Sequence, residues 1–383
     1  MDVDLGDELT ALRCRARKVA LAGVAQHGAF HDSWINGYSK EFSRTLAAEG
    51  WIGMTWPTEH GGGGRPAIER IVMAEEMISV GAPVAASWFA DRQLGPSFIA
   101  YGTPEQRERF LPGMLSGETT WCIGMSEPDA GSDLASLATF AARDGNDWVI
   151  SGQKIWTSFA QVADYCYLIC RTSREGPPHR GISEIVVPME TQGIEVRPVV
   201  DMTTNAHFCE VFFNEVRVPA DNLVGIEGDA FKQTMRQLEH ERGGIDRLVS
   251  NRALYERALE VCDRRDPMVR QAIARLESGY RLGRLLVYRE ALGQAPAGFS
   301  AATKCFCTEH EQRVADFAVR MLGPLAIAES SGPDARPESS PEGVIARSFA
   351  YSPAYTIMGG TSTVMRNILG ERVLGLPREP KVG

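Results

Sequence analysis

The segment Gly-Met-Ser-Glu-Pro-Asp-Ala-Gly-Ser-Asp at residues 124–133 follows directly on the apolar run Thr-Trp-Cys-Ile at residues 120–123. A proline, two glycines and three carboxylates this close together exclude the interior of an ordinary helix or strand. The segment predicts a tight polar turn that brings backbone N–H groups and the hydroxyls of Ser126 and Ser132 close to a ligand. A surface turn between two strands is the alternative interpretation.

The composition narrows the classes of function. With 383 residues, the chain is long enough for two or three domains and a large buried core. Its formal charge of −9 argues against a nucleic-acid partner, because phosphate binding needs a basic face. The longest apolar run, around residues 80–90, is too short to span a bilayer, so we expect no membrane insertion.

The N-terminal residues and the cysteines favour a cytoplasmic protein. The acidic N-terminus lacks the basic and then apolar pattern of a secretory signal. The eight cysteines show no framework spacing, so they are expected to stay reduced. Cys305 and Cys307 have no second pair and no nearby histidine pattern, and we therefore predict no metal site.

The pattern of elements changes twice along the chain. Helical periodicity extends from residue 8 to about residue 117 and returns from residue 231, whereas short β-rich runs separated by turn residues occupy residues 119–224. Thr103 and Pro104 are placed as the N-cap and first residue of one helix. We predict an α+β, multi-domain chain: an N-terminal helical domain (1–118), a central antiparallel β-barrel or sandwich (119–225) and a C-terminal helical bundle (226–383). The expected strands include residues 148–150, 165–170, 185–187 and 209–213.

A second motif, Gly-Gln-Lys-Ile-Trp-Thr-Ser at residues 152–158, opens a strand-rich stretch. A tryptophan in a strand is usually a core residue. Together, however, the two segments resemble the acyl-CoA dehydrogenases, whose members carry Ser/Thr-Glu-Pro-x-Ala-Gly-Ser-Asp and then Lys-x-Trp-x-Thr/Ser. The family also has helices, a β domain and helices in this order, so the resemblance covers nearly the whole chain.

The resemblance implies an FAD cofactor and an acyl-CoA substrate. By it, Met125 and Ser126 flank the pyrimidine side of the flavin, and Trp156 packs beside the isoalloxazine ring. Ser158 hydrogen-bonds near flavin N5, and Ser132 lies near the phosphopantetheine of the substrate. The resemblance also assigns three further groups to the cofactor: Thr157, Gly360 with Thr361, and Thr363.

The usual catalytic base of the family is absent from this sequence. Residues 355–363 resemble a segment that reads Glu-Gly-Thr-Ser in many members, and there the Glu removes the α-proton of the substrate. This chain has Gly359 at that position, and glycine has no proton acceptor. The backbone N–H of Gly359 is expected to bind substrate by polarising the thioester carbonyl. A simple flexible junction is the alternative.

A replacement base is predicted on a helix spanning residues 231–258. Leu-Glu-His-Glu-Arg at residues 238–242 resembles the Leu-x-x-Glu-Arg context that supplies the base in one branch of the family, which makes Glu241 the catalytic residue. A solvated charged face is the alternative. Glu239 and Arg242 are assigned to substrate binding. Gly243 and Gly244 are unusual in a helix centre, where each glycine costs about 1 kcal/mol, and they would let a ligand approach the backbone.

The sequence departs from the family where the flavin crosses a subunit interface. Residues 262–269 lack the Arg-x-x-Phe-Gly segment, and Arg320 replaces the Gln of Gln-x-x-Gly-Gly, where it could bind a diphosphate. These changes imply a divergent homo-oligomer or a heterotetramer with a second acyl-CoA dehydrogenase-like subunit. The resemblance extends to sterol-degrading members, which implies a bulky, branched or sterol-derived acyl chain as substrate. It also implies that an electron-transfer flavoprotein accepts the electrons. The alternatives are a flavin oxidase or N-oxygenating enzyme of the same fold, or a non-catalytic subunit.

Overall fold

The computed structural model describes residues 6–324 and 341–378, with the side chains of residues 237–242 and 341–344 outside the described set. The chain divides into two compact units. The helical unit comprises Met1–Gly37, Pro66–Pro83 and Glu239–Gly383, and the β unit comprises Tyr38–Arg65 and Val84–Leu238. Residues of the expected N-terminal helical domain occur in both units, and the bounds of the three predicted domains stay a prediction.

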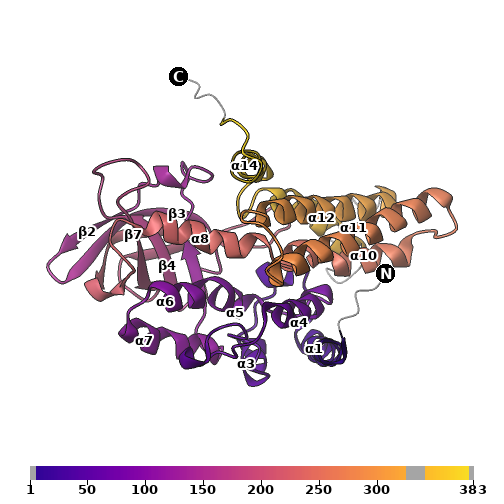
Figure 1. The fold of residues 1–383 in the computed structure, drawn as a ribbon, viewed down its shortest axis with the longest axis horizontal. Coiled ribbons are helices and arrows are strands. Elements are labelled where there is room, and N and C mark those ends of the chain that lie inside the picture. The colour runs from indigo at the N-terminus through magenta and orange to yellow at the C-terminus, as the bar shows by residue number, and fades with distance from the viewer. Residues whose placement is uncertain (1–5, 325–340, 379–383) are drawn as a thin grey trace, which may run out of the picture. The chain divides into compact units, whose positions relative to one another are not determined.

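The β unit is built on one sheet of eight strands in the order β6-β7-β3-β2-β4-β5-β8, with β1 paired to β4 (Figure 1). The four strand runs expected from the sequence all lie within strands of this sheet, which confirms them. The strands are β1 (Trp121–Gly124), β2 (Phe140–Asp144), β3 (Asp147–Ser158), β4 (Tyr165–Arg171), β5 (Ile182–Pro188), β6 (Ile194–Val199), β7 (Phe208–Pro219) and β8 (Leu223–Val224).

The sheet is mixed, so the expectation of a purely antiparallel β domain is wrong in one respect. Strand β1 pairs with β4 in parallel, with Trp121 opposite Tyr165, and a single parallel bridge joins Phe140 of β2 to Arg171 of β4. The other pairings are antiparallel. Parallel neighbours need a long crossover connection. Here that connection contains residues 125–133 and the β2–β3 hairpin, so the polar turn leaves the sheet at the end of β1.

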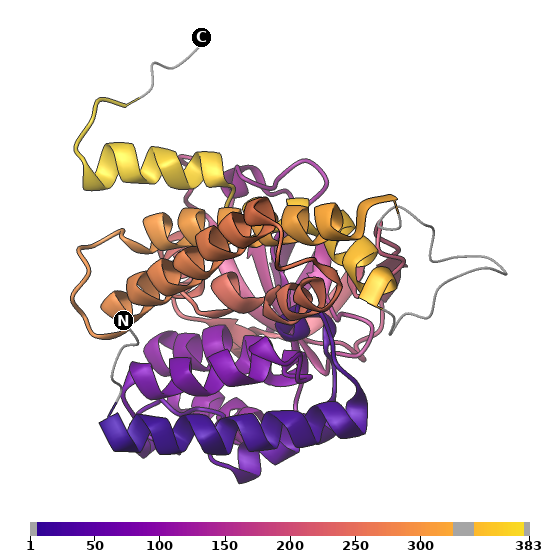
Figure 2. The same cartoon turned by 90° about the vertical axis from the view of Figure 1, so that its right-hand side faces the viewer.

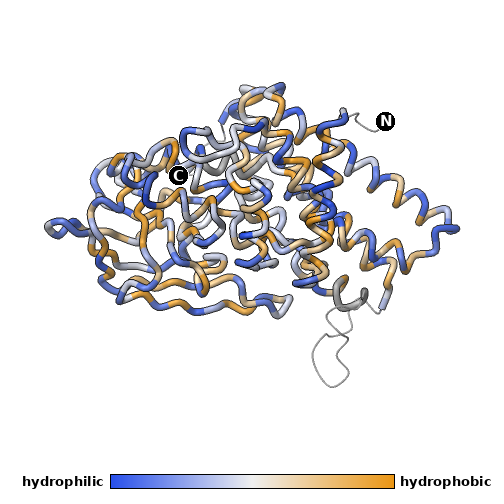
Figure 3. Tube along the Cα trace, turned by 90° about the horizontal axis from the view of Figure 1, so that it is seen from below, coloured by the Kyte–Doolittle hydropathy of each residue, from blue (hydrophilic) through white to orange (hydrophobic). Residues whose placement is uncertain are grey.

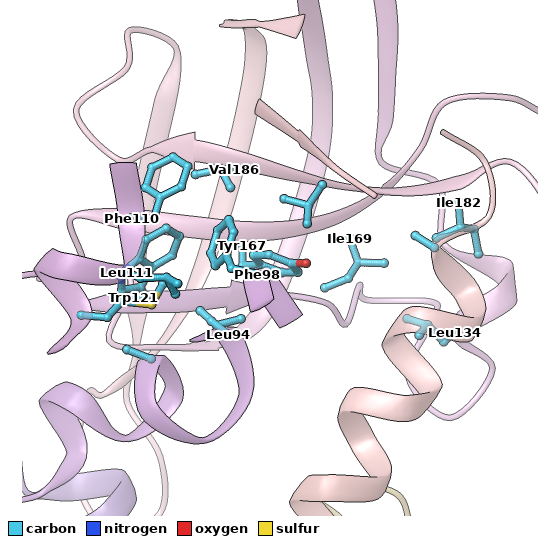
Figure 4. Packing of buried hydrophobic residues seen from close by; sticks show 14 of the residues in the cluster. Leu94, Phe98, Phe110, Leu111, Trp121, Leu134, Tyr167, Ile169, Ile182 and Val186 are labelled. Carbon is cyan, nitrogen blue, oxygen red and sulfur yellow. The ribbon is translucent and has the colours of Figure 1, made fainter. Parts of the chain in front are cut away.

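Helices cover one face of this sheet and complete its core. Figure 4 shows Phe98, Phe110 and Leu111 gathered against Trp121 and Tyr167 from the strands. The Phe98 and Phe110 rings meet Trp121 edge-on at centroid distances of 5.5 and 5.4 Å, a favourable aromatic geometry. The helices of this unit are α3 (Lys40–Ala48), α5 (Ala85–Phe89), α6 (Gly95–Tyr101), α7 (Pro104–Leu115) and the first part of α8 (Ala230–Arg242).

The start of α7 confirms the predicted N-cap. The Thr103 side chain accepts from the Gln106 backbone at 3.2 Å, and the Gln106 side chain accepts from the Thr103 backbone at 3.1 Å. This capping box satisfies two of the free N–H groups at the helix start. The amide of Gln106 also donates to the carbonyls of Asp221 and Leu223, at 2.6 and 2.8 Å, and so ties α7 to the start of β8 and the turn before it.

The helical unit packs long amphipathic helices. Helix α1 lies against α4, and α11 lies against α12 (Figure 2). Polar and apolar residues alternate along the long helices, as Figure 3 shows, which is the pattern of helices with one buried face. The remaining helices are α1 (Gly6–His27), α2 (Ser33–Asn36), α4 (Ala67–Ser79), α9 (Asp246–Val249), α10 (Arg252–Val261), α11 (Pro267–Ala291), α12 (Ser300–Leu322), α13 (Pro341–Tyr351) and α14 (Ser362–Ile368).

The single helix expected over residues 231–258 is wrong. Helix α8 ends at Arg242, and α9 and α10 follow as separate helices. The break falls at Gly243 and Gly244, since two adjacent glycines lower helix stability at one point. A Cβ at Gly243 would lie 2.1 Å from a carboxylate oxygen of Glu290. The small residue at position 243 therefore makes room for a neighbouring side chain, and the approach of a ligand to this backbone stays a prediction.

A buried acid, Asp32, connects the start of the chain to the segment before Gly359. Asp32 is 1% exposed and accepts a short hydrogen bond from the Tyr355 hydroxyl. The same hydroxyl lies 3.0 Å from the side-chain oxygen of Asn251, whose amide nitrogen donates to the Glu311 carbonyl. One hydroxyl proton cannot serve two acceptors, so a neutral Asp32 that supplies the second proton completes the network. Burial raises the pKa of Asp32 to about 7, against the opposing hydrogen bonds of Tyr355 and Ser250.

Asp32→Asn is expected to stabilise the protein relative to wild type more at pH 8 than at pH 5. The unfolded carboxyl loses its proton near its ordinary pKa of 3.8, whereas the folded one keeps it to about 7. Wild-type stability therefore falls as pH rises between these values, and the neutral amide removes that dependence. Melting temperatures of both proteins from pH 4 to pH 9 measure the effect. Parallel curves for the two proteins would contradict it.

Candidate active site

The polar turn at residues 124–133 is closed by its own backbone. The N–H of Glu127 donates to the Ala130 carbonyl at 3.0 Å, and the N–H of Ala130 donates to the Glu127 carbonyl at 3.1 Å. Pro128 and Asp129 occupy the tip between them. The predicted tight turn is therefore confirmed. Ser132 lies on its exposed part, and Ser126 is half-buried at its start.

A buried ion pair joins the two sequence motifs. Lys154 is fully buried in β3, and its Nζ lies 2.8 Å from Oε1 of Glu127 and 3.0 Å from the Met125 carbonyl. The same carboxylate accepts the backbone N–H groups of Ala138 and Thr139, at 2.6 and 2.9 Å. Every oxygen of Glu127 thus has a donor, which is how a charged group is retained in a protein interior.

The two charges of this pair respond differently to burial. Burial alone would raise the pKa of Glu127, but Lys154 and the hydrogen-bond donors outweigh it and leave that pKa lowered. Burial lowers the pKa of Lys154, and the charge of Glu127 opposes that shift. The carboxylate is therefore ionised at neutral pH and holds its ammonium partner.

The backbone of β3 changes direction at the second motif. Trp156 has φ +60°, and the register with β7 shifts between Lys154 and Thr157. This bulge leaves the Trp156 side chain 55% exposed, with its ring edge-on to Phe208 at 5.7 Å. A large aromatic side chain in a left-handed conformation is uncommon in proteins and marks a constrained position. The alternative interpretation of Trp156 as a core residue is thus excluded.

The two motifs lie side by side in the β unit. The N–H of Ile155 donates to the Ser126 carbonyl at 2.9 Å, so the polar turn adjoins the residue before Trp156. Met125 packs partly against the cluster of α6 and α7. Thr157 is 1% exposed and its hydroxyl has no partner among the described residues, whereas Ser158 is 9% exposed at the end of the strand.

The sequence analysis did not single out Arg171, which holds together the turn after Asp133 and the loop between β4 and β5. This nearly buried guanidinium at the end of β4 donates to five backbone carbonyls and to no carboxylate among the described residues. The acceptors belong to the turn after Asp133 and to the loop between β4 and β5: Leu137, Ser173, Arg180, Ala135 and Pro178, at 3.2, 3.4, 3.0, 2.7 and 3.1 Å. An arginine at the end of an apolar strand was the available signal.

Four of the predicted residues of the helical unit, Gly359, Gly360, Thr361 and Thr363, lie around the start of α14. Gly359 and Gly360 have φ values of +66° and +94°, so both need the freedom of glycine. The Thr361 hydroxyl accepts from the Val364 backbone at 3.2 Å and caps α14, and Thr363 is exposed. Arg320, at the end of α12, is 72% exposed and pairs with Asp316 at 2.9 Å.

Three predicted residues lie at the end of α8. Glu239, Glu241 and Arg242 belong to its last turn. Their side chains lie outside the described set, so their roles stay predictions.

Comparison with known proteins agrees with this architecture. Three family models match in order: the N-terminal domain of acyl-CoA dehydrogenases at residues 6–118, the middle domain at 122–216 and the C-terminal domain at 228–374. The chain belongs to the acyl-CoA dehydrogenase family. The resemblance inferred from the two motifs is therefore confirmed, and so is the predicted fold class of two helical domains around a β domain.

Relatives of this acyl-CoA dehydrogenase include a solved structure whose description refers to a steroid. Acyl-CoA dehydrogenase IpdE1 of Mycobacterium tuberculosis is 36% identical over 374 residues, covering 94% of each chain. The structure described as the Tcur3481-Tcur3483 steroid ACAD has a TM-score of 0.87 and 31% identity, covering 99% of this chain and 100% of that one. The ChsE4-ChsE5 complex from Mycobacterium tuberculosis has a TM-score of 0.84 and 31% identity, with the same coverage.

Acyl-CoA dehydrogenases of this family are FAD-dependent flavoproteins that oxidise acyl-CoA thioesters. In the described part of this chain, no helix has the length and apolar character needed to cross a membrane.

Proposed function

We propose that this acyl-CoA dehydrogenase uses FAD to introduce an α,β double bond into a bulky, branched or sterol-derived acyl-CoA. The observation that carries the proposal is the junction of the two motifs in the β unit. The Glu127–Lys154 pair and the Ile155–Ser126 hydrogen bond fix small hydroxyls next to an exposed tryptophan. Such a surface suits a planar, polar-edged aromatic ring.

The residues present fit an FAD group. Trp156 offers an exposed ring whose orientation is set by the bulge and by Phe208. Met125, Ser126, Thr157 and Ser158 would hold the flavin in the β unit, and the set from the helical unit would be Arg320, Gly360, Thr361 and Thr363. Bound FAD supplies a hydride acceptor. Because the Thr361 hydroxyl accepts the cap hydrogen bond of α14 with one lone pair, its O–H would remain free to donate to the cofactor.

Glu241 is the proposed base that removes the α-proton. An α-proton of a thioester is a weak acid, so the base must lie in a dry environment that raises its pKa toward the working pH. Position 359 cannot supply this group, because it is glycine. The backbone N–H of Gly359 would instead polarise the thioester carbonyl, with Ser132, Glu239 and Arg242 holding the rest of the substrate.

The substrate class and the assembly follow the relatives. Two solved structures of similar chains are heteromeric in name, and one is described as a steroid enzyme, which supports a heterotetramer with a second subunit of this family; a homo-oligomer is the alternative. An electron-transfer flavoprotein is the proposed acceptor of the electrons. The eight cysteines are all free, which supports a reducing, cytoplasmic location.

Purified protein is expected to carry a flavin spectrum that acyl-CoA bleaches without oxygen. The chain should be prepared alone and with co-expressed candidate subunits, and then mixed anaerobically with straight-chain, branched and steroid-derived acyl-CoAs. Rapid bleaching by one class, with an enoyl-CoA as product, supports the proposal. Flavin bound only in the presence of a partner identifies a heteromer. Bound flavin that no acyl-CoA of the panel bleaches would contradict the proposed reaction.

Gly359 also favours a second candidate, a flavin oxidase or N-oxygenating enzyme of the same fold, because the usual base is missing. Oxygen consumption by the reduced protein, compared with electron transfer to an artificial acceptor, separates the two reactions. A non-catalytic subunit would bind little flavin in either preparation.

A further inference from the structure

A second buried carboxylate, Glu184, lies at the centre of the β unit and has no part in the proposed reaction. It is 1% exposed in β5, between Ile169 of β4 and Val224 of β8. In the described part of the chain its hydrogen-bond partners are all neutral. Burial raises the pKa of Glu184, and these hydrogen bonds oppose that shift. Burying a carboxylate in an apolar core costs free energy of folding. Its retention there therefore suggests a role.

Two of its three partners belong to α8. Oε1 of Glu184 accepts from the Thr234 hydroxyl at 2.7 Å, and Oε2 accepts from the Gln233 amide at 3.0 Å. The third donor is the Tyr167 hydroxyl of β4, at 2.7 Å from Oε2. Glu184 therefore bridges the sheet to the first turns of α8.

The start of α8 is held tightly by this contact. A Cβ at Gly225 would lie 2.2 Å from the Gln233 amide oxygen, so the loop before the helix closes directly over that side chain. Ala230 is fully buried at the first position of the helix, and Phe231 and Met235 pack partly against the core of the β unit. Rotation or sliding of α8 would break the bonds to Thr234 and Gln233 together.

Helix geometry connects this anchor to the proposed base. Position 241 follows Thr234 by seven residues, which is two turns and about 10.5 Å along an α-helix. Residues seven apart fall on the same side of the helix axis. The contact that fixes the rotation of α8 at Thr234 thus also fixes the side of the helix on which position 241 lies.

We propose that Glu184 is a positioning residue, which sets the rotation and axial position of α8 and thereby the placement of the base at Glu241. The inference rests on the proposed function, because it takes Glu241 as the base. It gives a role to a buried acid that neither the proposed flavin site nor the proposed substrate site uses.

Two substitutions separate positioning from mere stability. Thr234→Val and Tyr167→Phe each remove one hydroxyl that donates to Glu184, but only Thr234 lies on α8. Both should lower the melting temperature. Thr234→Val should also lower the rate of flavin reduction about 10- to 100-fold, since small misplacements of catalytic groups have effects of this size, and leave KM within about twofold. Tyr167→Phe should keep the wild-type rate.

Conservative replacement of the acid itself should restore the position. In Glu184→Gln the amide oxygen can take both donors now on Oε2, and its NH2 can donate to Thr234, whose proton then turns to the Ala230 carbonyl at 3.0 Å. Near-normal kcat is expected for Glu184→Gln, and a loss like that of Thr234→Val is expected for Glu184→Leu.

The assay uses the acyl-CoA of the panel that bleaches wild-type flavin fastest, with Glu241→Gln measured alongside. Wild-type rates in Glu241→Gln would refute the proposed base rather than the anchor. If Glu241→Gln is inactive but Thr234→Val and Tyr167→Phe lose rate equally, the anchor is refuted. Hydrogen exchange of residues 231–242 gives a readout without turnover. Faster exchange through residue 241 in Thr234→Val, and not in Tyr167→Phe, supports the anchor, and unchanged exchange overturns it.

Discussion

Glu241→Gln is expected to abolish α,β-dehydrogenation while leaving the flavin bound. The amide matches the shape of the carboxylate but cannot accept the α-proton. General-base catalysis contributes about 10²- to 10⁴-fold to a rate, so flavin reduction should slow by that factor. Anaerobic stopped-flow bleaching with the best acyl-CoA measures the rate, and the visible spectrum measures the amount of flavin retained.

A surface glutamate provides the matched control for that experiment. Glu260 lies on the exposed side of α10, where it pairs with Arg257 at 3.2 Å, and Glu260→Gln should reduce flavin at the wild-type rate. The pH profile adds a second test, because removal of the base should eliminate the ascending limb of the rate. A Glu241→Gln enzyme that turns over normally would place the base elsewhere.

Lys154→Met is expected to destabilise the β unit by about 3–5 kcal/mol, because it leaves the Glu127 carboxylate buried without its cation. Glu127→Gln, which leaves Lys154 without its anion, should have a similar effect. Flavin binding should weaken in both variants, since Lys154 of this pair holds the Met125 carbonyl against β3 and Ser126 lies between Met125 and Glu127. Urea titration followed by tryptophan fluorescence measures the stability, and equilibrium dialysis measures the flavin affinity.

The double variant tests whether the pair acts as a unit. Lys154→Met combined with Glu127→Gln removes both charges. The double variant should therefore lose less folding free energy than the sum of the losses in the two single variants. An exposed pair, Arg217 with Asp144, offers a comparison, and Arg217→Met should change stability little because water already screens that contact. Additive losses in the double variant would show that the ion pair is not the link between the motifs.

Local pattern predicts much of this fold. The strand runs and the Thr103 cap depend on neighbouring residues only, and both are present in the structure. The parallel pairing of β1 with β4 depends on a partner some forty residues away in sequence, and strand periodicity contains no information about it. The helix break at the Gly243–Gly244 pair is visible in the sequence, but the close approach of the Glu290 carboxylate to Gly243 is not, because Glu290 lies on a helix that is distant in sequence.

The sequence motifs predicted which segments form the candidate site, but not which side chains are in contact there. Residues 124–133 and 152–158 identified the family, but nothing in their spacing shows that Glu127 meets Lys154 inside the protein. The buried acids Asp32 and Glu184 have hydroxyl partners hundreds or tens of residues away, so their environment becomes known only with the tertiary structure. The sequence pattern could not predict the contacts of buried polar residues whose partners are distant in sequence.

The left-handed backbone at Gly359 would make the proposed relocation of the base to Glu241 hard to reverse. A glutamate at that position would have to adopt φ near +66°, where residues other than glycine lose about 1–2 kcal/mol, and the next residue is also a glycine with positive φ. A lineage that lost the acid there and then let the chain settle into this shape has no single-step way back. Under the proposed mechanism, this backbone would favour retention of the base on α8.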